Sequence, residues 1–553
     1  MNSKTQQIKN CEHCKHNFTI SEGELVLYKK VGLEPSTLCF FCRTRLQLSF
    51  WIFGKFRKGK SDLSGASLIT VLPENKYPIY TLSEWHSDKW DPIDYGTDYD
   101  PNVSFFAQLK ILKEKVPRPH QVGTKNTGCD WCDDVWESKN CYLSRSMIGC
   151  EDLFYSYRNL NVRNSIDMNV CFESEKCYDC GDCHNSYKLF YSRHCKDCIE
   201  SSFLYDCRNC QNCFMSWNLR NKSFCIENVQ YSKEEYEEKI QSFNLGSYEA
   251  VKSLKERFAG LVQREAVHRE NFNLKSYNST GNFLIDDKDC INCNTISDSE
   301  ECRNCVRGFK LKSAIDMTGC WKSELIGNCC KCESSYDIKH STQSSSRYSE
   351  YVDLCIECEY CFGCVGLKKK KYCILNKQFT KKEYESLKGK IISDMKERGE
   401  YGKFFPYSMS DGPFNFSSGI LYFPETKKED ILNLGGSWED INESQQEGMS
   451  TAELLDSIND VTDAIITQAL VCPETGWRFN INKNELDFYR TNNIPLPRYH
   501  FDARTKKALK YLTILKAYPY TCFYCKKDIE AYYLPEWGYK KIACEECYKQ
   551  NIA

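Results

Sequence analysis

The sequence has no long apolar run and no excess of charge of either sign. No stretch of its 553 residues approaches the roughly 18–20 apolar residues of a membrane-spanning helix. Residues 1–11, MNSKTQQIKNC, are polar and lack the apolar core of a signal peptide. The 74 basic and 76 acidic residues nearly cancel, so global charge favours neither nucleic acid nor any other charged partner. These absences predict a cytoplasmic protein that does not enter a membrane.

Catalytic motifs are missing as well. The chain has 9 histidines, and it has no glycine-rich phosphate loop, no GxSxG nucleophile elbow and no HExxH zinc motif. We therefore predict that the protein is not an enzyme. A redox-active CxxC stays an alternative, because one such pair cannot be singled out among so many cysteines.

Cysteine is what the chain has in abundance, with 36 residues, many of them at CxxC spacing. In a short secreted protein this pattern would indicate disulfides. Here the polar N-terminus favours a reducing compartment, and CxxC suits tetrahedral zinc because a tight turn aims two thiolates at one ion. The alternative is a mixture, in which a sizeable part of the cysteines are buried as small apolar residues.

The two ends of the chain match each other. When they are aligned, Cys11 falls on Cys472, and the FTI at 18–20 falls on the FNI at 479–481. The same alignment pairs charged and aromatic residues: Glu24 with Glu485, Tyr28 with Tyr489, and Arg43 with Arg504. Each end is therefore predicted to hold two zinc-ribbon units in tandem.

One unit of each tandem pair has four cysteines, which predicts structural zinc at Cys11, Cys14, Cys39 and Cys42 and at Cys522, Cys525, Cys544 and Cys547. The other unit is degenerate, with Ser61, Ser64, Ser83 and His86 in the leading copy and Cys472, Thr475, His500 and Ala503 in the last copy. Four thiolates leave no open coordination position, so such ions hold a fold together and do not act as Lewis acids. The predicted cofactor is Zn²⁺, with at least two ions per chain.

Between the ends lie two cysteine-dense lobes, 123–230 and 284–378. In rows of twelve residues, the first lobe aligns Cys171, Cys183, Cys195 and Cys207 in one column, with small residues at every third position and a large apolar residue in most rows. This pattern predicts a narrow β-solenoid whose thiols fill the interior, bind zinc, or do both. A string of separate zinc knuckles is the alternative, although knuckles would not keep the apolar column through rows without cysteine.

The second lobe repeats the plan of the first, so that Asp167-Met168 recurs as Asp316-Met317. Each lobe ends in a capping box that starts a helix, Ser232 with Glu235 and Thr380 with Glu383, which predicts helices at 233–270 and about 381–397. We also assign further metal ligands to the lobes, without grouping them: Cys129, Cys132, Cys177, Cys180, Cys183, Cys195, Cys198, Cys207, Cys210, Cys213, Cys290, Cys293, Cys302, Cys305, Cys329, Cys332, Cys355, Cys358, Cys361 and Cys364.

The predicted domains follow from these boundaries. They are an N-terminal ribbon (1–60), a degenerate ribbon unit with an acidic-aromatic segment (61–122), the first lobe (123–230), a helical linker (231–283), the second lobe (284–378), a helix (379–400), a connecting segment (401–470) and a C-terminal ribbon pair (471–553). Within the connecting segment we expect an amphipathic helix near 451–471. The fold class is mainly β with connecting helices, with zinc ribbons at both ends flanking two short-coil, solenoid-like lobes.

Residues 43–60, RTRLQLSFWIFGKFRKGK, combine basic and aromatic residues and contain no acid. Basic side chains neutralise phosphates, and aromatic rings stack on unpaired bases. The matching stretch of the last copy is also basic, and four lysines at 368–371 form a third cluster. We predict nucleic-acid contacts from Arg43, Arg45, Trp51, Lys55, Arg57, Lys58, Lys60, Arg504, Lys506 and Lys507. The alternative is that the aromatics pack the ribbon and the charges face water.

Residues 85–100, WHSDKWDPIDYGTDYD, are acidic and aromatic. Such a mixture can line a carbohydrate or cation site. More often it is an ordered loop that packs on its neighbour, and we favour that interpretation.

Several of these segments resemble a family of cysteine-rich zinc-ribbon proteins from the genomes of small-celled candidate-phylum bacteria. They are CEHCKHNFTI…LCFFCR at 11–43, EWHSDKWDPIDYGTDYD at 84–100, KVPRP at 115–119, the two lobe exits at 213–240 and 361–385, FFP at 404–406 and CEECY at 544–548. Ser61 and Ser64 depart from the more cysteine-rich relatives, which puts a zinc there in doubt. The resemblance implies a bacterial, cytoplasmic, zinc-dependent protein and supplies no activity.

Together these patterns predict a zinc-stabilised binding protein that contacts nucleic acid or a ribonucleoprotein through its basic-aromatic ribbon ends. The alternative is a protein–protein interaction scaffold without nucleic acid. Zinc storage and redox catalysis are favoured less.

Overall fold

The computed structural model describes residues 6–440 and 447–552, which form two compact units. Unit 1 comprises Met1–Gln121 and Asn271–Glu439, and unit 2 comprises Val122–Glu270 and Asp440–Ala553. Each unit thus combines a terminal ribbon pair with the lobe that lies farther from it in the sequence. The N-terminal pair joins the second lobe, and the C-terminal pair joins the first lobe. Strands hold 33% and helices 25% of the structure, which confirms a mainly β protein with connecting helices. Among the described residues, no helix is both long enough and apolar enough to cross a membrane.

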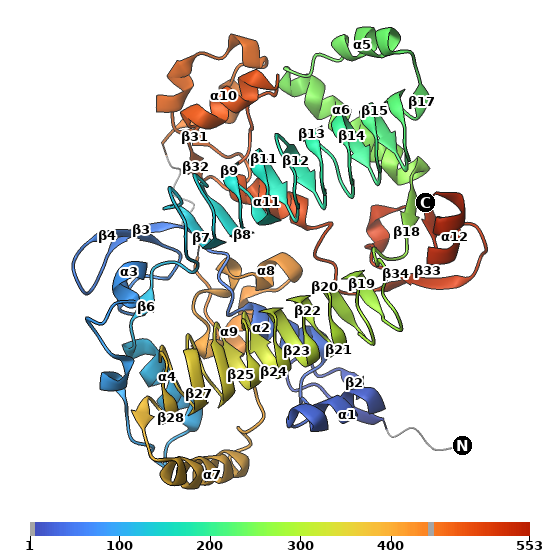
Figure 1. Ribbon diagram of the computed structural model, residues 1–553. Coiled ribbons are helices and arrows are strands. Elements are labelled where there is room, and N and C mark those ends of the chain that lie inside the picture. The colour runs from blue at the N-terminus through green and yellow to red at the C-terminus, as the bar shows by residue number, and fades with distance from the viewer. Residues whose placement is uncertain (1–5, 441–446, 553) are drawn as a thin grey trace. The chain divides into compact units, whose positions relative to one another are not determined.

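Unit 1 joins the N-terminal ribbon pair, blue in Figure 1, to the second lobe, yellow-green. Its first stretch holds β1 (Gln7–Asn10), β2 (Asn17–Ile20), α1 (Glu22–Val31), α2 (Phe40–Leu48), β3 (Arg57–Lys60), β4 (Ser67–Thr70), β5 (Ile79–Tyr80), α3 (Leu82–Trp85), α4 (Phe105–Lys115) and β6 (Arg118–Pro119). Its second stretch holds β19 (Gly281–Ile285), β20 (Cys293–Ser297), β21 (Glu300–Arg303), β22 (Val306–Phe309), β23 (Lys312–Trp321), β24 (Glu324–Cys330), β25 (Tyr336–Thr342), β26 (Ser345–Glu350), β27 (Ile356–Phe362), β28 (Lys371–Ile374), β29 (Lys377–Gln378), α7 (Lys381–Glu397), α8 (Gly419–Tyr422) and α9 (Lys428–Asn433). Helices α1 and α2 pack on β23 and β24.

Unit 2 joins the first lobe to the C-terminal ribbon pair. Its first stretch holds β7 (Cys132–Trp136), β8 (Ser144–Ile148), β9 (Glu151–Phe154), β10 (Tyr157–Leu160), β11 (Arg163–Asn169), β12 (Tyr178–Gly181), β13 (Tyr187–Phe190), β14 (Ile199–Tyr205), β15 (Gln211–Trp217), β16 (Ser223–Ile226), β17 (Val229–Gln230), α5 (Lys233–Gln241), α6 (Tyr248–Glu265) and β18 (Val267–Arg269). Its second stretch holds β30 (Met449–Ser450), β31 (Leu470–Val471), β32 (Arg478–Phe479), α10 (Lys483–Thr491), α11 (Phe501–Leu509), β33 (Tyr518–Thr521), β34 (Asp528–Ala531), β35 (Lys541–Ala543) and α12 (Glu545–Asn551). Helix α11 packs on β11 and β12.

Each lobe is one large sheet of short strands that pair in parallel until a final antiparallel strand closes it. Most paired residues lie twelve positions apart, so that Met168 opposes Cys180 in the first lobe and Cys361 opposes Cys373 in the second, while β25 and β26 pair at a spacing of eleven. Figure 1 shows the strands of each lobe stacked side by side. One row of the sequence alignment therefore corresponds to one step along the sheet.

The backbone turns at every third residue of the lobes. Asp179, Asp182 and Asn185 take φ values of 50°, 53° and 48°, and the same left-handed conformation recurs along both lobes. Asn and Asp tolerate this conformation better than other residues with a β-carbon, and they fill many of these positions. The residue after each turn points into the lobe, which explains why small residues occur every third position.

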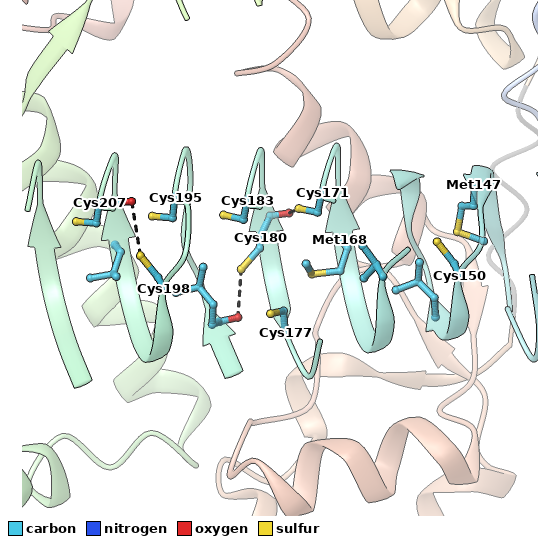
Figure 2. Close-up of a cluster of buried hydrophobic side chains, with 14 of the residues drawn as sticks. Met147, Cys150, Met168, Cys171, Cys177, Cys180, Cys183, Cys195, Cys198 and Cys207 are labelled. Carbon is cyan, nitrogen blue, oxygen red and sulfur yellow. Dashed lines mark hydrogen bonds between the residues drawn. The ribbon is translucent and has the colours of Figure 1, made fainter. Parts of the chain in front are cut away.

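The lobe interior is lined with sulfur. Figure 2 shows Cys171, Cys183, Cys195 and Cys207 in one row across neighbouring strands of the first lobe. All four are at most 1% exposed, and they belong to a buried cluster that also contains leucine, valine and methionine. Strands this short enclose little space between them, so thiols serve as small apolar filling.

The inward side chains also satisfy backbone carbonyls. The Cys180 thiol lies 3.5 Å from the Tyr178 carbonyl and 3.2 Å from the Leu189 carbonyl, close enough to donate to either. Ser186 donates to the His184 carbonyl at 2.9 Å in the same way. Cysteine and serine alternate in these columns because both are small and both can donate a hydrogen bond.

In unit 1 the ribbon docks on the lobe through one buried aspartate. The Arg43 Nε lies 2.8 Å from Asp316 Oδ1, and both side chains are at least 94% buried, with exposures of 6% and 0%. The Tyr28 hydroxyl donates to the same carboxylate at 2.5 Å, and Gln47 donates to the Asp316 carbonyl at 2.6 Å. The residues that the sequence alignments matched between the two copies are thus the ones that join a ribbon to its lobe.

Unit 2 repeats this contact with a looser geometry. The Arg504 Nη2 lies 3.3 Å from Asp167 Oδ1. Burial raises the pKa of Asp167 to about 7, although Arg504 opposes the shift. Burial also raises the pKa of Glu485, which is 1% exposed, to about 8. At neutral pH Glu485 therefore keeps its proton and does not neutralise Arg504.

Three expectations about secondary structure can be compared with the structure. The capping boxes at Ser232 and Thr380 are confirmed, but the first exit forms two helices, α5 and α6. The prediction of a helix near 451–471 is wrong. That part of the chain forms three short 3-10 turns. The Ser450 and Ser457 hydroxyls each accept a hydrogen bond from the backbone N–H two residues on, which begins a new short turn in place of a continuous helix. Residues 441–446 of the connecting segment lie outside the described residues.

The second lobe also begins earlier than expected. Leu274 already forms a parallel bridge to Ile285, although the linker was predicted to run to residue 283. The first row of this lobe has no cysteine, and the sequence pattern that was used to find the lobe therefore missed it.

We expect Arg43→Met to lower the free energy of unfolding by about 3–5 kcal/mol, because it leaves the Asp316 carboxylate buried without its partner. Urea unfolding of the zinc-loaded protein, followed by tryptophan fluorescence, measures the change. Lys30→Ala is the matched control, since Lys30 pairs with Glu301 at an exposed position, and we expect it to cost less than about 1 kcal/mol. Equal effects of the two substitutions would contradict the role given to Asp316.

We expect Glu485→Gln to stabilise unit 2 more at about pH 8 than at about pH 5. The pKa of Glu485 rises from 4.5 to about 8 on folding, so the native state holds a proton that the unfolded state releases, and stability falls as pH rises through this window. Gln removes that loss, which amounts to at most about 5 kcal/mol. Urea unfolding of both proteins at the two pH values is the measurement, and an equal difference at both would rule the effect out.

Candidate metal centres

The four cysteines of the leading ribbon lie on two turns that face each other. Cys11 and Cys14 occupy the turn between β1 and β2, where Lys15 takes a φ of 63° and its N–H donates to the Cys11 carbonyl at 3.0 Å. Cys39 is the N-cap of α2, and Cys42 lies in the first turn of that helix. The Cys39 N–H donates to Cys11 Sγ at 3.3 Å. One turn and one helix start thus bring the four thiols together.

The C-terminal set has the same construction. Cys522 and Cys525 occupy the turn between β33 and β34, and Lys526 takes a φ of 62° there. Cys544 is the N-cap of α12, and its N–H donates to Cys522 Sγ at 3.4 Å. Cys547 follows in the first turn.

Both sets fit a tetrahedral metal ion. Within each set the four sulfurs lie within 4.8 Å of one another. Cys14 Sγ and Cys39 Sγ are 3.8 Å apart, and Cys525 Sγ and Cys544 Sγ are 3.9 Å apart. Zinc with bonds of about 2.3 Å places neighbouring thiolates about 3.8 Å apart. The two sets can therefore hold metal ions such as zinc.

In each set the surroundings favour the thiolate form of one cysteine, Cys39 or Cys522, while the pKa values of Cys14, Cys42, Cys544 and Cys547 are raised, chiefly by burial and neighbouring thiols. A hydrogen bond from the Cys42 thiol lowers the pKa of Cys39 to about 5. Burial raises the pKa of Cys522, but N–H groups of Cys544 and Cys525 that point at its sulfur bring it down to about 6. Both sets also lie at a helix N-terminus, where the peptide dipoles favour negative charge.

The cysteines of the lobes are placed differently. Among residues 6–440 and 447–552, the two terminal sets are the groups of three or more such side chains close enough to share an ion, and no lobe cysteine belongs to one. All lobe cysteines are free and buried. Burial raises the pKa of Cys177 well above its usual range, which favours the thiol. The metal sites assigned to the twenty lobe cysteines stay a prediction, and the structure gives many of these thiols a carbonyl partner.

The degenerate units keep the ribbon backbone without its thiols. The Ser61 hydroxyl donates to Glu84 Oε2 at 2.5 Å. This hydrogen bond connects the turn between β3 and β4 to helix α3, as a zinc ion does in a complete ribbon. In the last copy, His500 replaces the N-cap cysteine of α11 and its ring accepts the Asp502 N–H at 3.2 Å. Its ring also meets Trp477 edge to face at 5.2 Å.

Several residues predicted to contact nucleic acid are occupied within the protein. Arg43 pairs with Asp316 and Arg504 with Asp167, as described above. Trp51 is 4% exposed, with the Arg307 guanidinium 3.6 Å from its ring centre. These side chains therefore join a ribbon to its lobe and do not face solvent as a contact with nucleic acid requires.

The other predicted contacts lie nearer the surface. Arg45 donates to the Tyr407 hydroxyl at 3.3 Å, Arg57 pairs with Glu439 at 2.5 Å, and Lys507 pairs with Glu474 at 2.5 Å. The exposed side chains of the set are Lys55, Lys58, Lys60, Lys506 and Lys507. The first three of these lie on or beside β3, so the strand presents a basic edge to solvent.

The lysine cluster at 368–371 meets the acidic-aromatic segment at 85–100. The Lys368 Nζ lies 4.0 Å from the Trp85 ring centre, and Lys370 pairs with Asp91 at 3.0 Å. The two segments thus pack on each other, which is the alternative that the sequence analysis favoured for the acidic segment.

Sequence analysis missed three exposed aromatic residues inside the metal turns. Phe41 lies between Cys39 and Cys42, and Phe523 and Tyr524 lie between Cys522 and Cys525, with exposures of 39%, 38% and 36%. The signal was present as CFFC and CFYC. Because both cysteines of a CxxC turn point at the ion, the residues between them face outward, and large aromatics there are exposed.

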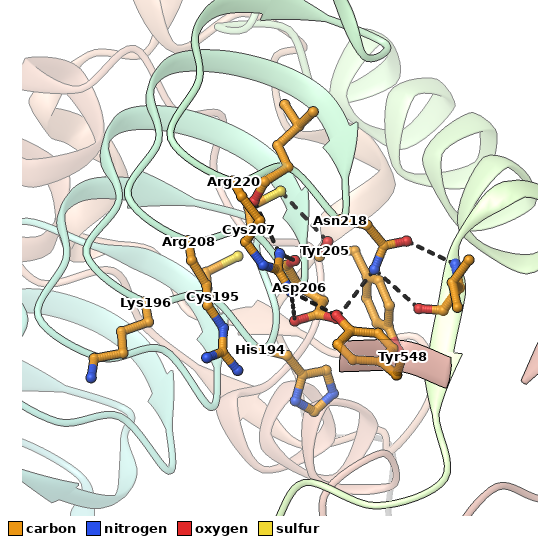
Figure 3. A network of polar contacts seen from close by, with 12 residues as sticks. His194, Cys195, Lys196, Tyr205, Asp206, Cys207, Arg208, Asn218, Arg220 and Tyr548 are labelled. Atoms are coloured by element: carbon orange, nitrogen blue, oxygen red, sulfur yellow. Dashed lines mark hydrogen bonds and ion pairs between the residues drawn. The ribbon is translucent and has the colours of Figure 1, made fainter. Parts of the chain in front are cut away.

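The C-terminal set is tied to the first lobe by a polar network next to Cys547. Figure 3 shows Asp206, Arg220 and Tyr548 meeting at one point. The Tyr548 hydroxyl donates to Asp206 and accepts from Arg220 Nη2 at 2.6 Å, and Arg220 pairs with Asp206 at 3.3 Å. Helix α12 carries Cys547 of the C-terminal set, and the next residue, Tyr548, fixes this helix to the lobe.

Comparison with protein-family models gives no match, and comparison with curated proteins gives none. Among solved structures, one similar chain is a crystal structure from Desulfovibrio desulfuricans G20 of a protein provisionally named an acetyltransferase. It shares 10% identity over 44% of this chain and 63% of its own length, with a TM-score of 0.09. The match thus spans less than two thirds of that protein. A TM-score of this size carries no information on the fold or activity of the present chain.

We expect each terminal set to bind one zinc ion, so that Cys11→Ser and Cys522→Ser each remove one ion per chain. Native mass spectrometry of protein purified under reducing conditions counts the ions. Cys180→Ser is the matched control, since serine keeps the hydrogen bond to the carbonyl, and we expect it to leave the count unchanged. A loss of zinc on Cys180→Ser would instead support metal in the first lobe, and an unchanged count on Cys522→Ser would contradict the C-terminal site.

Proposed function

We propose that this protein is a zinc-stabilised binding protein of the bacterial cytoplasm that contacts single-stranded nucleic acid, free or within a ribonucleoprotein, through exposed ribbon ends. The four-cysteine sets hold the ends in shape, and the lobes supply rigid support. Zinc is the metal that four thiolates at these distances suit best. The free state of the cysteines supports a reducing compartment.

The observation that carries the proposal is the C-terminal metal turn, residues 522–527. All residues of this turn except Cys522 are exposed. The rings of Phe523 and Tyr524 meet edge to face with centres 5.1 Å apart. The Lys526 and Lys541 ammonium groups lie 5.3 Å and 6.0 Å from the Phe523 ring centre. The two adjacent rings give this turn an exposed apolar surface, a feature found at binding sites.

This arrangement suits an unpaired base beside a phosphate. An exposed ring stacks on a base, which contributes about 1–3 kcal/mol, while lysines next to it neutralise the backbone. The N-terminal ribbon offers similar chemistry, with Phe41 exposed in its metal turn and a basic edge along β3. Both ends of the chain thus carry aromatic and basic side chains at the surface.

The lobe faces are less suited to nucleic acid. Their lysines pair with glutamates one row away, for example Lys139 with Glu151 and Lys288 with Glu300, at 2.8 and 2.9 Å. Such ladders leave little net charge along the face. We propose that each lobe is a β-solenoid with twelve-residue coils, which the parallel pairing at that spacing and the turn at every third residue support over separate zinc knuckles.

A protein-binding scaffold is the second candidate, and one feature favours it. In the second lobe, Tyr348, Tyr360 and Tyr372 stack in successive rows with ring centres 4.9 and 5.2 Å apart. Tyr348 is 38% exposed. A rigid tyrosine ladder of this kind suits an interface with another protein, since tyrosine is enriched at such interfaces.

We expect the zinc-loaded protein to bind labelled single-stranded RNA with micromolar affinity at low salt. Replacing Phe523 and Tyr524 with Ala should weaken binding about tenfold or more, because each lost stack costs about 1–3 kcal/mol. Replacing Lys526 and Lys527 with Ala should lower the log–log salt slope by about 1.4, which corresponds to about 0.7 per lost phosphate contact on single strands. Fluorescence anisotropy at several salt concentrations measures both effects.

Tyr277→Ala is the matched control, because Tyr277 is an exposed tyrosine, at 72%, outside the ribbons. It should leave RNA binding unchanged. Zinc counts of all variants confirm that the metal turns stay intact. Absence of binding at low salt would reject the nucleic-acid proposal and favour the scaffold, to be followed by a search for a protein that the tyrosine ladder holds.

A further inference from the structure

The two docking sites have diverged, and unit 2 has a cavity of about 180 Å³ at its site. Its walls come from the first lobe at Tyr142, Leu143 and Tyr155, and from the last ribbon copy at Phe479, Phe501 and other residues of β32, α10 and α11. Glu485 and Arg504 line the same space. An apolar cavity of about 150 Å³ holds one benzene ring, so this volume suits a small molecule with a single ring.

Arg504 is incompletely paired in this cavity. Its Nη2 lies 3.3 Å from Asp167, but its Nε and Nη1 are buried and have no hydrogen-bond partner among the described residues. A buried donor without an acceptor costs about 1–3 kcal/mol, and more when it is charged. An acceptor brought by a ligand would recover this energy.

The matching site in unit 1 shows what closes such a cavity. Arg43 Nε, like Arg504 Nε, makes no hydrogen bond to the described residues, although it forms the ion pair with Asp316. Arg43 Nη1 donates to the Leu38 carbonyl at 2.8 Å, so the sites differ at Nη1, which in Arg504 has no hydrogen-bond partner in the described part of the chain. Asn304 donates to Glu24 at 2.7 Å and accepts from Asn292 at 2.7 Å.

In unit 2 the residues that match these two asparagines are Tyr155 and Leu143, so the amide bridge is absent and the walls become apolar. The difference between the sites therefore lies in the side chains that surround one shared arginine.

The charge of the cavity favours an anion. Burial raises the pKa of Glu485 to about 8, so at neutral pH its carboxyl is protonated and can donate a hydrogen bond. Arg504 stays charged, and Tyr155 lies 5.1 Å below its guanidinium and 5.3 Å from the Phe501 ring, nearly parallel to it. A small molecule with a carboxylate would thus meet charged and neutral hydrogen-bond donors at the carboxylate and aromatic rings around its remaining atoms.

We propose that this cavity binds a small aromatic carboxylate, with the carboxylate on Arg504 and the ring among Tyr142, Tyr155, Phe479 and Phe501. The nucleic-acid proposal is independent of this site, because none of these residues belongs to the exposed metal turns. The site reuses the ribbon's docking arginine as a ligand-binding residue.

Benzoate is the probe, titrated into the zinc-loaded full chain by isothermal calorimetry at neutral pH. We expect saturable binding of one molecule per chain in the micromolar to millimolar range, and much weaker binding of benzyl alcohol, which has the ring without the charge. Arg504→Lys should weaken benzoate at least about tenfold, since about 1.4 kcal/mol of lost hydrogen bonding corresponds to that factor. Arg43→Lys, the same change at the closed site of unit 1, should leave the affinity unchanged.

A second variant keeps the test decisive if Arg504→Lys does not fold. Leu143→Trp fills the cavity from a part-buried wall position, and it should abolish benzoate binding while zinc content and circular dichroism stay as in the parent. The proposal is overturned if benzoate does not saturate at millimolar concentration, if benzyl alcohol binds equally well, or if Leu143→Trp binds benzoate as the parent does. Loss of RNA binding in the metal-turn variants with benzoate binding intact would separate the two proposals.

Discussion

Each lobe depends on side chains that fit a very narrow interior and also satisfy its carbonyls. With the backbone turning at every third residue, the inward positions face carbonyl groups two residues back and nine residues on, as at Cys180. Leucine, valine and methionine fill space there but donate nothing, whereas cysteine and serine do both. This constraint accounts for much of the cysteine content without any ion. It also explains why serine occupies the same columns, as at Ser186.

The ribbons depend on the lobes in turn. A ribbon unit has almost no apolar core of its own. In unit 1, helices α1 and α2 of the leading four-cysteine ribbon pack on lobe strands, and in unit 2 helix α11 of the degenerate ribbon does so. The contact is anchored by an arginine and an aspartate that recur in both copies. In unit 1 this pair is closely bonded and the four-cysteine set beside it is complete. In unit 2 the pair is looser, and the ribbon next to it keeps one cysteine of the set, Cys472, so a complete four-cysteine set and tight docking are found together.

How far the sequence alone predicts this structure depends on the residue. The two four-cysteine sets were found because CxxC spacing encodes a tight turn. The pairing of strands about twelve residues apart agrees with the columns of cysteine, because one column corresponds to one position along the paired strands. The alignments matched Arg43 with Arg504 and Asp167 with Asp316, but periodicity and spacing carry no information on which ribbon meets which lobe. For that reason Arg43 and Trp51 were assigned to a ligand, although they are buried at a contact between distant segments. The 3-10 turns after Ser450 were missed because their hydroxyl-to-backbone bonds leave the apolar spacing unchanged.

Each ribbon pair shares a unit with the lobe that lies farther from it in the sequence, and this order has a consequence for synthesis on the ribosome. Tyr28 is separated from its partner Asp316 by 288 residues, and at about 5–20 residues per second the delay between them is roughly a quarter of a minute to one minute. During that time the leading ribbon has no lobe to pack on, and its four cysteines are what can hold it in shape if metal is bound. At the other end the first lobe is made early and receives its ribbon last. Metal bound during translation would therefore stabilise the leading ribbon before its lobe exists.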